Sequence, residues 1–248
     1  MPENVSVEAK NYKRHPMSFK CEQYNGWSVI NGDFKEYLQD FEPINQDGFI
    51  DKYLESLKNN KKQVVIDLMA TPHALLSYKS EYLSDSSEFK GLAVGFVGDK
   101  SYLDNSKKNS DEFGISYING NLSYKKTWDS IKRWLGDVDK VDLIVSRGAG
   151  GVHYVPDYPN YQLAVVNKCW DMLADGGLAI LQIRKRTVSK EKDIHFYQWL
   201  EKLTDLGINY RFLAHYPPSR GKYVGEVNDC GLFMIQKDIK IDHLPGKI

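Results

Sequence analysis

Apolar residues along most of the chain follow two spacings. In segments such as Phe49–Leu57, Trp128–Leu135 and Phe196–Leu206 an apolar residue recurs at every third or fourth position, which predicts amphipathic helices. Short runs rich in β-branched and other apolar residues, such as 64–68 and 178–183, separate these segments and indicate buried strands. The two patterns alternate, so the chain is expected to build repeated β-α units.

The predicted elements have a regular order. The predicted strands cover 64–68, 92–97, 115–118, 143–145, 178–183, 210–213 and 232–235. The predicted helices cover Phe49–Leu57, a segment that starts at Pro72, Trp128–Leu135, Leu163–Leu173 and Phe196–Leu206, with Gly176-Gly177 and Gly207 as stops for the last two. This order is typical of a doubly wound α/β fold with a mostly parallel, seven-stranded sheet and helices on both faces. The last two strands are expected to pair antiparallel at one edge.

Bulk properties narrow the class of protein. Residues 47–248 are expected to form the main domain, and residues 1–46 an N-terminal extension that packs on it. Lys plus Arg equals Asp plus Glu at 33 each, so net charge indicates neither a nucleic-acid nor a membrane partner. The three cysteines are far apart, which argues against a disulfide framework or a structural zinc site. No apolar run is long enough to span a membrane, and a cytoplasmic location is expected.

Ligands of doubly wound sheets bind outside the carboxyl ends of the strands. The first predicted strand ends in Asp67-Leu68-Met69-Ala70-Thr71-Pro72. An acidic residue followed by a tight turn lets backbone amides face a ligand while the carboxylate holds its amine. The alternative is an ordinary turn with a solvated aspartate, and the residues by themselves do not decide between the two.

Three stretches together point to a family. They are the strand-Asp-Leu opening at Asp67, the run Val141–Ser146, and Leu173-Ala174-Asp175-Gly176-Gly177-Leu178 before the fifth strand. In this order and spacing they resemble the class I S-adenosylmethionine-dependent methyltransferases, over roughly residues 47–238. The resemblance implies a Rossmann-like fold, S-adenosylmethionine as cofactor, methyl transfer as the activity and no metal.

The resemblance also implies a set of cofactor-binding residues. They are Asp67, Ala70, Thr71, Asp99, Asn121, Leu122 and Ser146. Asp67 would hold the cofactor's amine, and Asn121 the adenine amino group through its side-chain oxygen. Asp99 would bind the ribose hydroxyls, although the Gly-Asp pair there also fits a simple turn.

The loop after the fourth strand carries the candidate catalytic groups. His153 is the candidate general base, because an imidazole titrates near neutral pH. Arg147 is placed to hold an anionic group of the acceptor. Basic residues also follow the fifth strand, at Arg184-Lys185-Arg186. The expected acceptor is therefore a small or anionic molecule, with RNA among the candidates.

Other functions compete with this one. Met69, Thr71 and His73 stand where the family prefers glycine, which motivates a catalytically inactive, methyltransferase-like scaffold as the alternative. A dinucleotide oxidoreductase is disfavoured, because the first loop lacks the Gly-x-Gly-x-x-Gly spacing. The catalytic tetrad of ribosomal-RNA 2′-O-methyltransferases is not carried over, since Arg147 and Gln182 stand where it needs Asp and Lys.

Overall fold

The computed structural model describes residues 34–68, 72–83, 88–95, 113–120, 122, 124–137, 139–146, 159–184, 194–216 and 230–246. The strands are β1 (Lys62–Leu68), β2 (Glu88–Gly95), β3 (Ile115–Asn119), β4 (Val141–Ser146), β5 (Leu173–Arg184), β6 (Tyr210–Tyr216) and β7 (Cys230–Gln236). The helices are α2 (Phe34–Asp40), the 3₁₀ turn η2 (Glu42–Ile44), α3 (Phe49–Leu57), α4 (Pro72–Tyr82), α6 (Lys125–Leu135), α7 (Pro159–Met172) and α9 (Ile194–Asp205).

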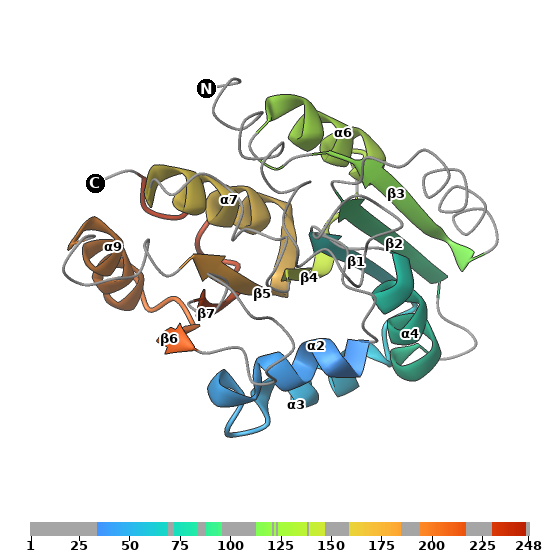
Figure 1. Cartoon of the computed structure of the whole chain (residues 1–248), viewed down its shortest axis with the longest axis horizontal. Coiled ribbons are helices and arrows are strands. Elements are labelled where there is room, and N and C mark those ends of the chain that lie inside the picture. The colour runs from blue at the N-terminus through green and yellow to red at the C-terminus, as the bar shows by residue number, and fades with distance from the viewer. Residues whose placement is uncertain are drawn as a thin grey trace, which may run out of the picture.

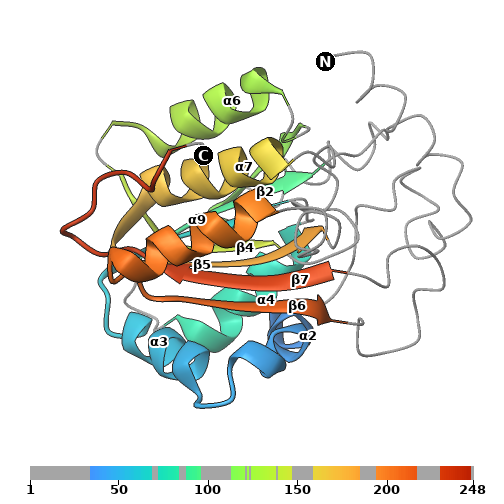
Figure 2. The ribbon, with the colours of Figure 1, turned by 90° about the vertical axis from the view of Figure 1, so that its left-hand side faces the viewer.

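The strands form one mixed sheet. Its order is β3-β2-β1-β4-β5-β7-β6. The pairs among β1 to β5 are all parallel, whereas β7 is antiparallel to both of its neighbours. Figure 2 shows β5, β7 and β6 side by side at that edge. The predicted α/β fold is confirmed, and the sheet is mixed rather than all parallel.

Each face of the sheet carries its own apolar core, because successive side chains of a strand point to opposite faces. In β1, Val64 and Ile66 belong to one cluster and Val65 to the other. Helices α6, α7 and α9 cover the first cluster, and α2, α3 and α4 cover the second (Figure 1). Wholly buried strand residues on both faces explain the near-continuous apolar runs in the sequence.

Two tryptophans hydrogen-bond to the C-terminal segment, residues 237–246, on the face of the sheet that α6, α7 and α9 cover. The indole N–H of Trp170 on α7 donates to the carbonyl of Ile241 at 3.3 Å. The indole of Trp199 on α9 donates to the carbonyl of Pro245 at 3.2 Å. Leu244 lies between these two points and is buried. The segment therefore lies against both helices and covers their apolar flanks.

On the second face, α2 and η2 contribute to the core. Phe34 is wholly buried, and its ring meets that of Tyr78 on α4 edge-on at 4.9 Å. Phe41 and Ile44 belong to the same cluster. The division of the chain at residue 46 stays a prediction.

Two predicted helix ends were wrong. Leu173 was placed on a helix, but α7 ends at Met172 and Leu173 pairs with Val141 in the sheet. The register then shifts, with Gly176 in the left-handed region at φ 78°, before β5 resumes beside β4. Leu206 was placed on the apolar face of α9, but the helix ends at Asp205 and this leucine is 51% exposed. In both cases an apolar side chain continued the helical spacing past the true end of the helix.

Candidate functional site

The carboxyl end of β1 carries a buried acidic residue. Asp67 pairs with Ala93 of β2 and Val145 of β4, and its side chain is 0% exposed. Ala93 and Val145 belong to the core on the face covered by α2, α3 and α4, so Asp67 lies on that face as well. A buried carboxylate is costly unless polar groups solvate it.

Asp67 also lies at the topological switch point of the sheet. From β1 the chain proceeds to β2 and β3 on one side and returns to β4 and β5 on the other. The helices that follow β1 and β4 therefore leave on opposite faces, and doubly wound sheets bind their ligands at the carboxyl ends of the strands at such a point. Figure 1 shows β1 and β4 as neighbours, with α4 on one face and α7 on the other.

The carboxyl end of β4 contributes Ser146. This residue is 0% exposed and follows Val145, the register partner of Asp67. Since side chains alternate along a strand, Ser146 points to the face opposite that of Asp67. The structure therefore brings the two residues to adjacent strand ends on either side of the sheet.

The segment after β3 carries Leu122, a third predicted cofactor residue. Its side chain is 3% exposed and packs in the core with the apolar residues of α6. Its carbonyl oxygen accepts a hydrogen bond from the indole of Trp128 at 2.7 Å. The predicted role of Leu122 in cofactor binding stays a prediction.

The remaining predicted site residues lie outside the described residues. They are Ala70, Thr71, Asp99, Asn121, Arg147 and His153. Their roles stay predictions. Among the residues that the structure does describe, no group of three or more His, Cys, Asp or Glu side chains could hold a metal ion. Nor does any helix in those ranges have the length and apolarity to cross a membrane.

The amino ends of the strands hold a polar network that the sequence did not reveal. Gln63 on β1 is wholly buried; its amide donates to the carbonyl of Leu57 at 2.7 Å, and its side-chain oxygen accepts from Tyr78 at 2.6 Å. Burial raises the pKa of the Tyr78 hydroxyl well above its usual value, so it stays a donor. This network joins β1 to α3 and α4.

A second part of the network centres on Asp142 of β4. Its carboxylate accepts the backbone N–H of Val64 at 2.7 Å, and its carbonyl accepts the hydroxyl of Tyr53 at 2.6 Å. Desolvation raises the pKa of Asp142, and it also raises the pKa of Tyr53 with help from the nearby Asp142 charge. These bonds lock α3 to the first and fourth strands.

Partly exposed charges add a third link at the same end of the sheet. Asp139 bridges Lys62 and Lys90 at 2.6 and 2.7 Å. The hydrogen bonds from both lysines lower the pKa of the Asp139 carboxyl. Lys90 also donates to the carbonyl of Leu135 at 3.0 Å, so it holds the end of α6 to β2.

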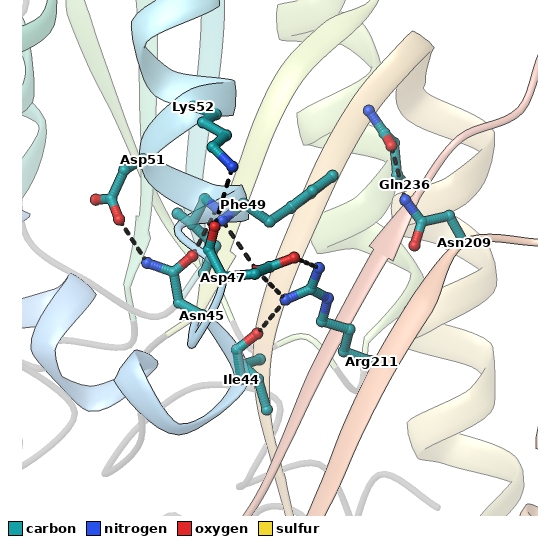
Figure 3. Close-up of polar contacts among 10 residues, drawn as sticks. Ile44, Asn45, Asp47, Phe49, Asp51, Lys52, Asn209, Arg211 and Gln236 are labelled. Carbon is teal, nitrogen blue, oxygen red and sulfur yellow. Dashed lines mark hydrogen bonds and ion pairs between the residues drawn. The ribbon is translucent and has the colours of Figure 1, made fainter.

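At the β6 edge, a guanidinium binds the connection between η2 and α3 (Figure 3). Arg211 donates to both carboxylate oxygens of Asp47, at 2.5 and 2.6 Å, and to the carbonyl of Ile44 at 3.0 Å. Its charge also lies 5.0 Å from the centre of the Phe49 ring. The bonds to Arg211 hold the pKa of Asp47 well below its usual value. This ion-pair cluster fastens the N-terminal helices to the last part of the sheet.

A pocket lies between α6 and α7. Its volume is about 520 Å³, and it is lined by apolar and mixed charged side chains: Trp128, Asp129, Lys132, Leu135, Gly136, Asp137, Asp139, Lys140, Lys168, Asp171 and Met172. It does not include Asp67 or Ser146. Its lining combines lysines with aspartates, so it selects no single ligand charge.

Comparison with known proteins shows a likeness in shape only. No model of a known protein family matches the chain, and no curated protein matches it. Solved structures do match, and those described here are methyltransferases or pre-rRNA processing proteins at low identity. A protein of Listeria monocytogenes described as a class I S-adenosylmethionine-dependent methyltransferase is 12% identical, with a TM-score of 0.48. The match covers 82% of this chain but only 63% of the Listeria protein.

Two further solved structures have similar scores. An S-adenosylmethionine-dependent methyltransferase of Clostridium acetobutylicum is 13% identical, over 84% of this chain and 93% of that one, with a TM-score of 0.46. The fibrillarin pre-rRNA processing protein of Methanococcus jannaschii is 15% identical, over 75% and 73% of the two chains, with a TM-score of 0.43. Similarity at this level establishes neither a shared activity nor membership of a family.

Proposed function

We propose that this protein transfers a methyl group from S-adenosylmethionine to a small or anionic acceptor. The observation that carries the proposal is the wholly buried Asp67 carboxylate at the carboxyl end of β1, beside the switch point between β1 and β4. That is the place where a doubly wound sheet binds its ligand. The sequence resemblance assigns the cofactor's amine to this same residue.

The predicted site residues have side chains suited to the polar parts of such a cofactor. The Asp67 carboxylate suits the ammonium of its methionine moiety, since a buried carboxylate gains most from a cationic partner. Asp99 is proposed for the ribose hydroxyls and Asn121 for the adenine amino group, and Ala70 and Thr71 are proposed to line the cofactor. When bound, the cofactor supplies an electrophilic methyl group on a positively charged sulfur.

The protein's own part in the reaction is mainly to position the two reactants. Methyl transfer needs the acceptor atom in line with the bond that breaks, and a base only for acceptors that lose a proton. We propose His153 as the general base and Arg147 as the residue that binds an anionic acceptor. RNA belongs to this acceptor class, and the cytoplasm is the proposed location.

Direct binding measurements test the proposal. Isothermal titration of the full chain with S-adenosylmethionine and S-adenosylhomocysteine is expected to give saturable, one-to-one binding of both. ATP, which carries the same nucleoside without the amino-acid part, serves as the control ligand and is expected to bind much more weakly. If neither S-adenosylmethionine nor S-adenosylhomocysteine binds at millimolar concentration, the result favours the catalytically inactive scaffold instead.

A further inference from the structure

The C-terminal segment departs from the sheet after Lys237. The N–H of Lys237 donates to the carbonyl of Gly177 at 2.9 Å, and its carbonyl accepts the N–H of Gly176 at 3.0 Å. A turn follows, in which the carboxylate of Asp238 accepts the backbone N–H of Lys240 at 2.9 Å. Residues 239–246 belong to no helix or strand, and Figure 2 shows them, in red, looping back from the end of β7 towards α7. Their position therefore depends on contacts with the helices rather than on pairing in the sheet.

Two indoles from different helices bind the backbone of this segment. Trp170 on α7 donates to the carbonyl of Ile241, and Trp199 on α9 donates to the carbonyl of Pro245. Both tryptophan side chains are wholly buried, so the segment supplies the acceptors that their N–H groups need. Pro245 has no backbone N–H of its own, so it offers its carbonyl without a donor that would also need a partner.

The side chains of the segment divide between the protein core and the solvent. Leu244 is 7% exposed and belongs to the same core cluster as Trp170 and Trp199. Ile241 packs against that cluster, whereas residues 242–243 between the two apolar side chains are exposed. Bound main-chain carbonyls combined with a few buried side chains are the usual means by which proteins recognise short peptides.

From these contacts we infer that α7 and α9 form a peptide-binding site for a short stretch with an apolar residue, two polar residues and then Leu-Pro. The protein's own C-terminal segment occupies this site as an intramolecular ligand. The segment leaves and rebinds as a unit while the sheet stays folded, because its anchors are few and lie beyond the turn at Asp238. A peptide of the same sequence from another molecule therefore competes for the site. The inference does not depend on the proposed function.

A labelled peptide tests the site on the full-length protein. The probe is a synthetic peptide of residues 238–246 with fluorescein at its N-terminus, and its binding is followed by fluorescence anisotropy. Leu244→Asp in the full-length protein removes the main apolar anchor of the tethered segment and so vacates the site. We expect this variant to bind the probe saturably, with a Kd on the order of 100 μM.

The wild type is expected to bind the same probe about tenfold more weakly. Its tethered segment competes at an effective concentration of about 1 mM, which is about ten times the expected Kd of the probe. Leu206→Asp is the matched control, because Leu206 lies just beyond α9 and is 51% exposed. That variant gains the same charge and keeps its segment in place, so its affinity for the probe should equal that of the wild type.

Two further comparisons locate the binding. A probe that itself carries Leu244→Asp is expected to bind none of the proteins. Trp199→Phe, added to the Leu244→Asp protein, removes the donor to the Pro245 carbonyl and is expected to weaken the native probe about fivefold.

Two results would overturn the inference. One is that no folded protein of the set binds the native probe at millimolar concentration. The other is that the wild type, Leu206→Asp and Leu244→Asp bind it equally, which would place the probe elsewhere on the surface. If Leu244→Asp does not fold, Leu244→Ala replaces it, since it shortens the anchor without adding a charge. The wild type also decides by itself, because it should bind the native probe with a Kd of about 1 mM and should not bind the Leu244→Asp probe.

Discussion

The two ends of the sheet use polar residues in different ways. At the amino end, Gln63, Tyr78 and Asp142 form short bonds to backbone or side-chain partners in neighbouring elements. At the carboxyl end, Asp67 and Ser146 are equally buried, but they stand at the last positions of strands, where the chain turns away from the sheet. The difference indicates separate roles: the polar bonds at the amino end stabilise the fold, and the carboxyl end is where we propose that the ligand binds.

The largest effect on binding is expected from Asp67→Asn. The substitution keeps the size of the side chain and removes its charge, so affinity for S-adenosylmethionine is expected to fall by about 10- to 100-fold, the range for a hydrogen bond to a charged group. Stability is expected to change little, because the variant no longer buries a carboxylate. Titration calorimetry measures the first quantity and urea denaturation the second.

Asp175→Asn is the control for this change. Asp175 is exposed, at the amino end of β5, and the same substitution there is expected to leave binding unchanged. If both variants bind the cofactor as the wild type does, Asp67 does not have the assigned role, and the contrast between the two ends of the sheet is lost.

At the amino end, Tyr78→Phe is expected to lower the stability of the fold and to leave cofactor binding almost unchanged, the reverse of Asp67→Asn. It removes the hydroxyl that donates to the wholly buried Gln63, and the unsatisfied amide oxygen should cost about 1–3 kcal/mol in the free energy of unfolding. Cofactor affinity is expected to stay within about twofold of the wild type, since the bond lies far from the carboxyl ends of the strands. Urea denaturation and calorimetry provide the two values.

Tyr210→Phe offers a matched comparison. The Tyr210 hydroxyl lies 2.9 Å from that of Thr204 at an exposed position on the sheet edge. Water replaces an exposed hydrogen bond at little cost, so this variant should lose less than about 1 kcal/mol. A loss as large as that of Tyr78→Phe would show that burial of Gln63 does not govern the stability of the amino end.

The smallest effect is expected at the exposed Asp47–Arg211 pair. Asp47→Asn should lower the melting temperature slightly, because exposed ion pairs are screened by solvent and salt. The bonds to Arg211 lower the pKa of Asp47 in the folded state. The contribution of this carboxylate is therefore fully present above its unfolded pKa of about 4, and it is lost as the pH falls towards the lower folded value.

Thermal melts of the wild type and Asp47→Asn between pH 7 and pH 3 check the direction in which the stabilisation by this ion pair changes with pH. Their difference in melting temperature is expected to be constant from pH 7 to about 5 and to shrink below about pH 4. Added salt should reduce it at neutral pH. A difference that grows on acidification would mean that the pair does not fasten the N-terminal helices in the way described.

Much of the fold could be predicted because its signals are local. The buried strands around Val65 and Ile180 and the helix at Trp128 follow from the spacing of apolar residues a few positions apart. The ends of helices α7 and α9 were less predictable, because Leu173 and Leu206 continue the helical spacing. The pairing of Leu173 with Val141 and the end of α9 at Asp205 depend on neighbours outside the segment.

The candidate site was predictable in part for the same reason. Asp67 could be placed at a strand end because an acidic residue directly follows a β-branched run, and the structure buries it there. The burial of the Leu122 side chain against α6 could not be foreseen, since it depends on how the helix packs back on its own preceding turn.

The sequence alone determined that this protein is an α/β chain with its chemistry expected beyond the carboxyl ends of the strands, because periodicity and strand-end residues are properties of neighbouring positions. Only the tertiary structure decided that Asp67 lies beside the switch point and that Arg211 binds Asp47 from 164 residues away. It also decided that Trp128 holds the turn after β3. Such contacts join segments whose proximity depends on the strand order and on the packing of helices over both faces, and no short stretch of sequence encodes either.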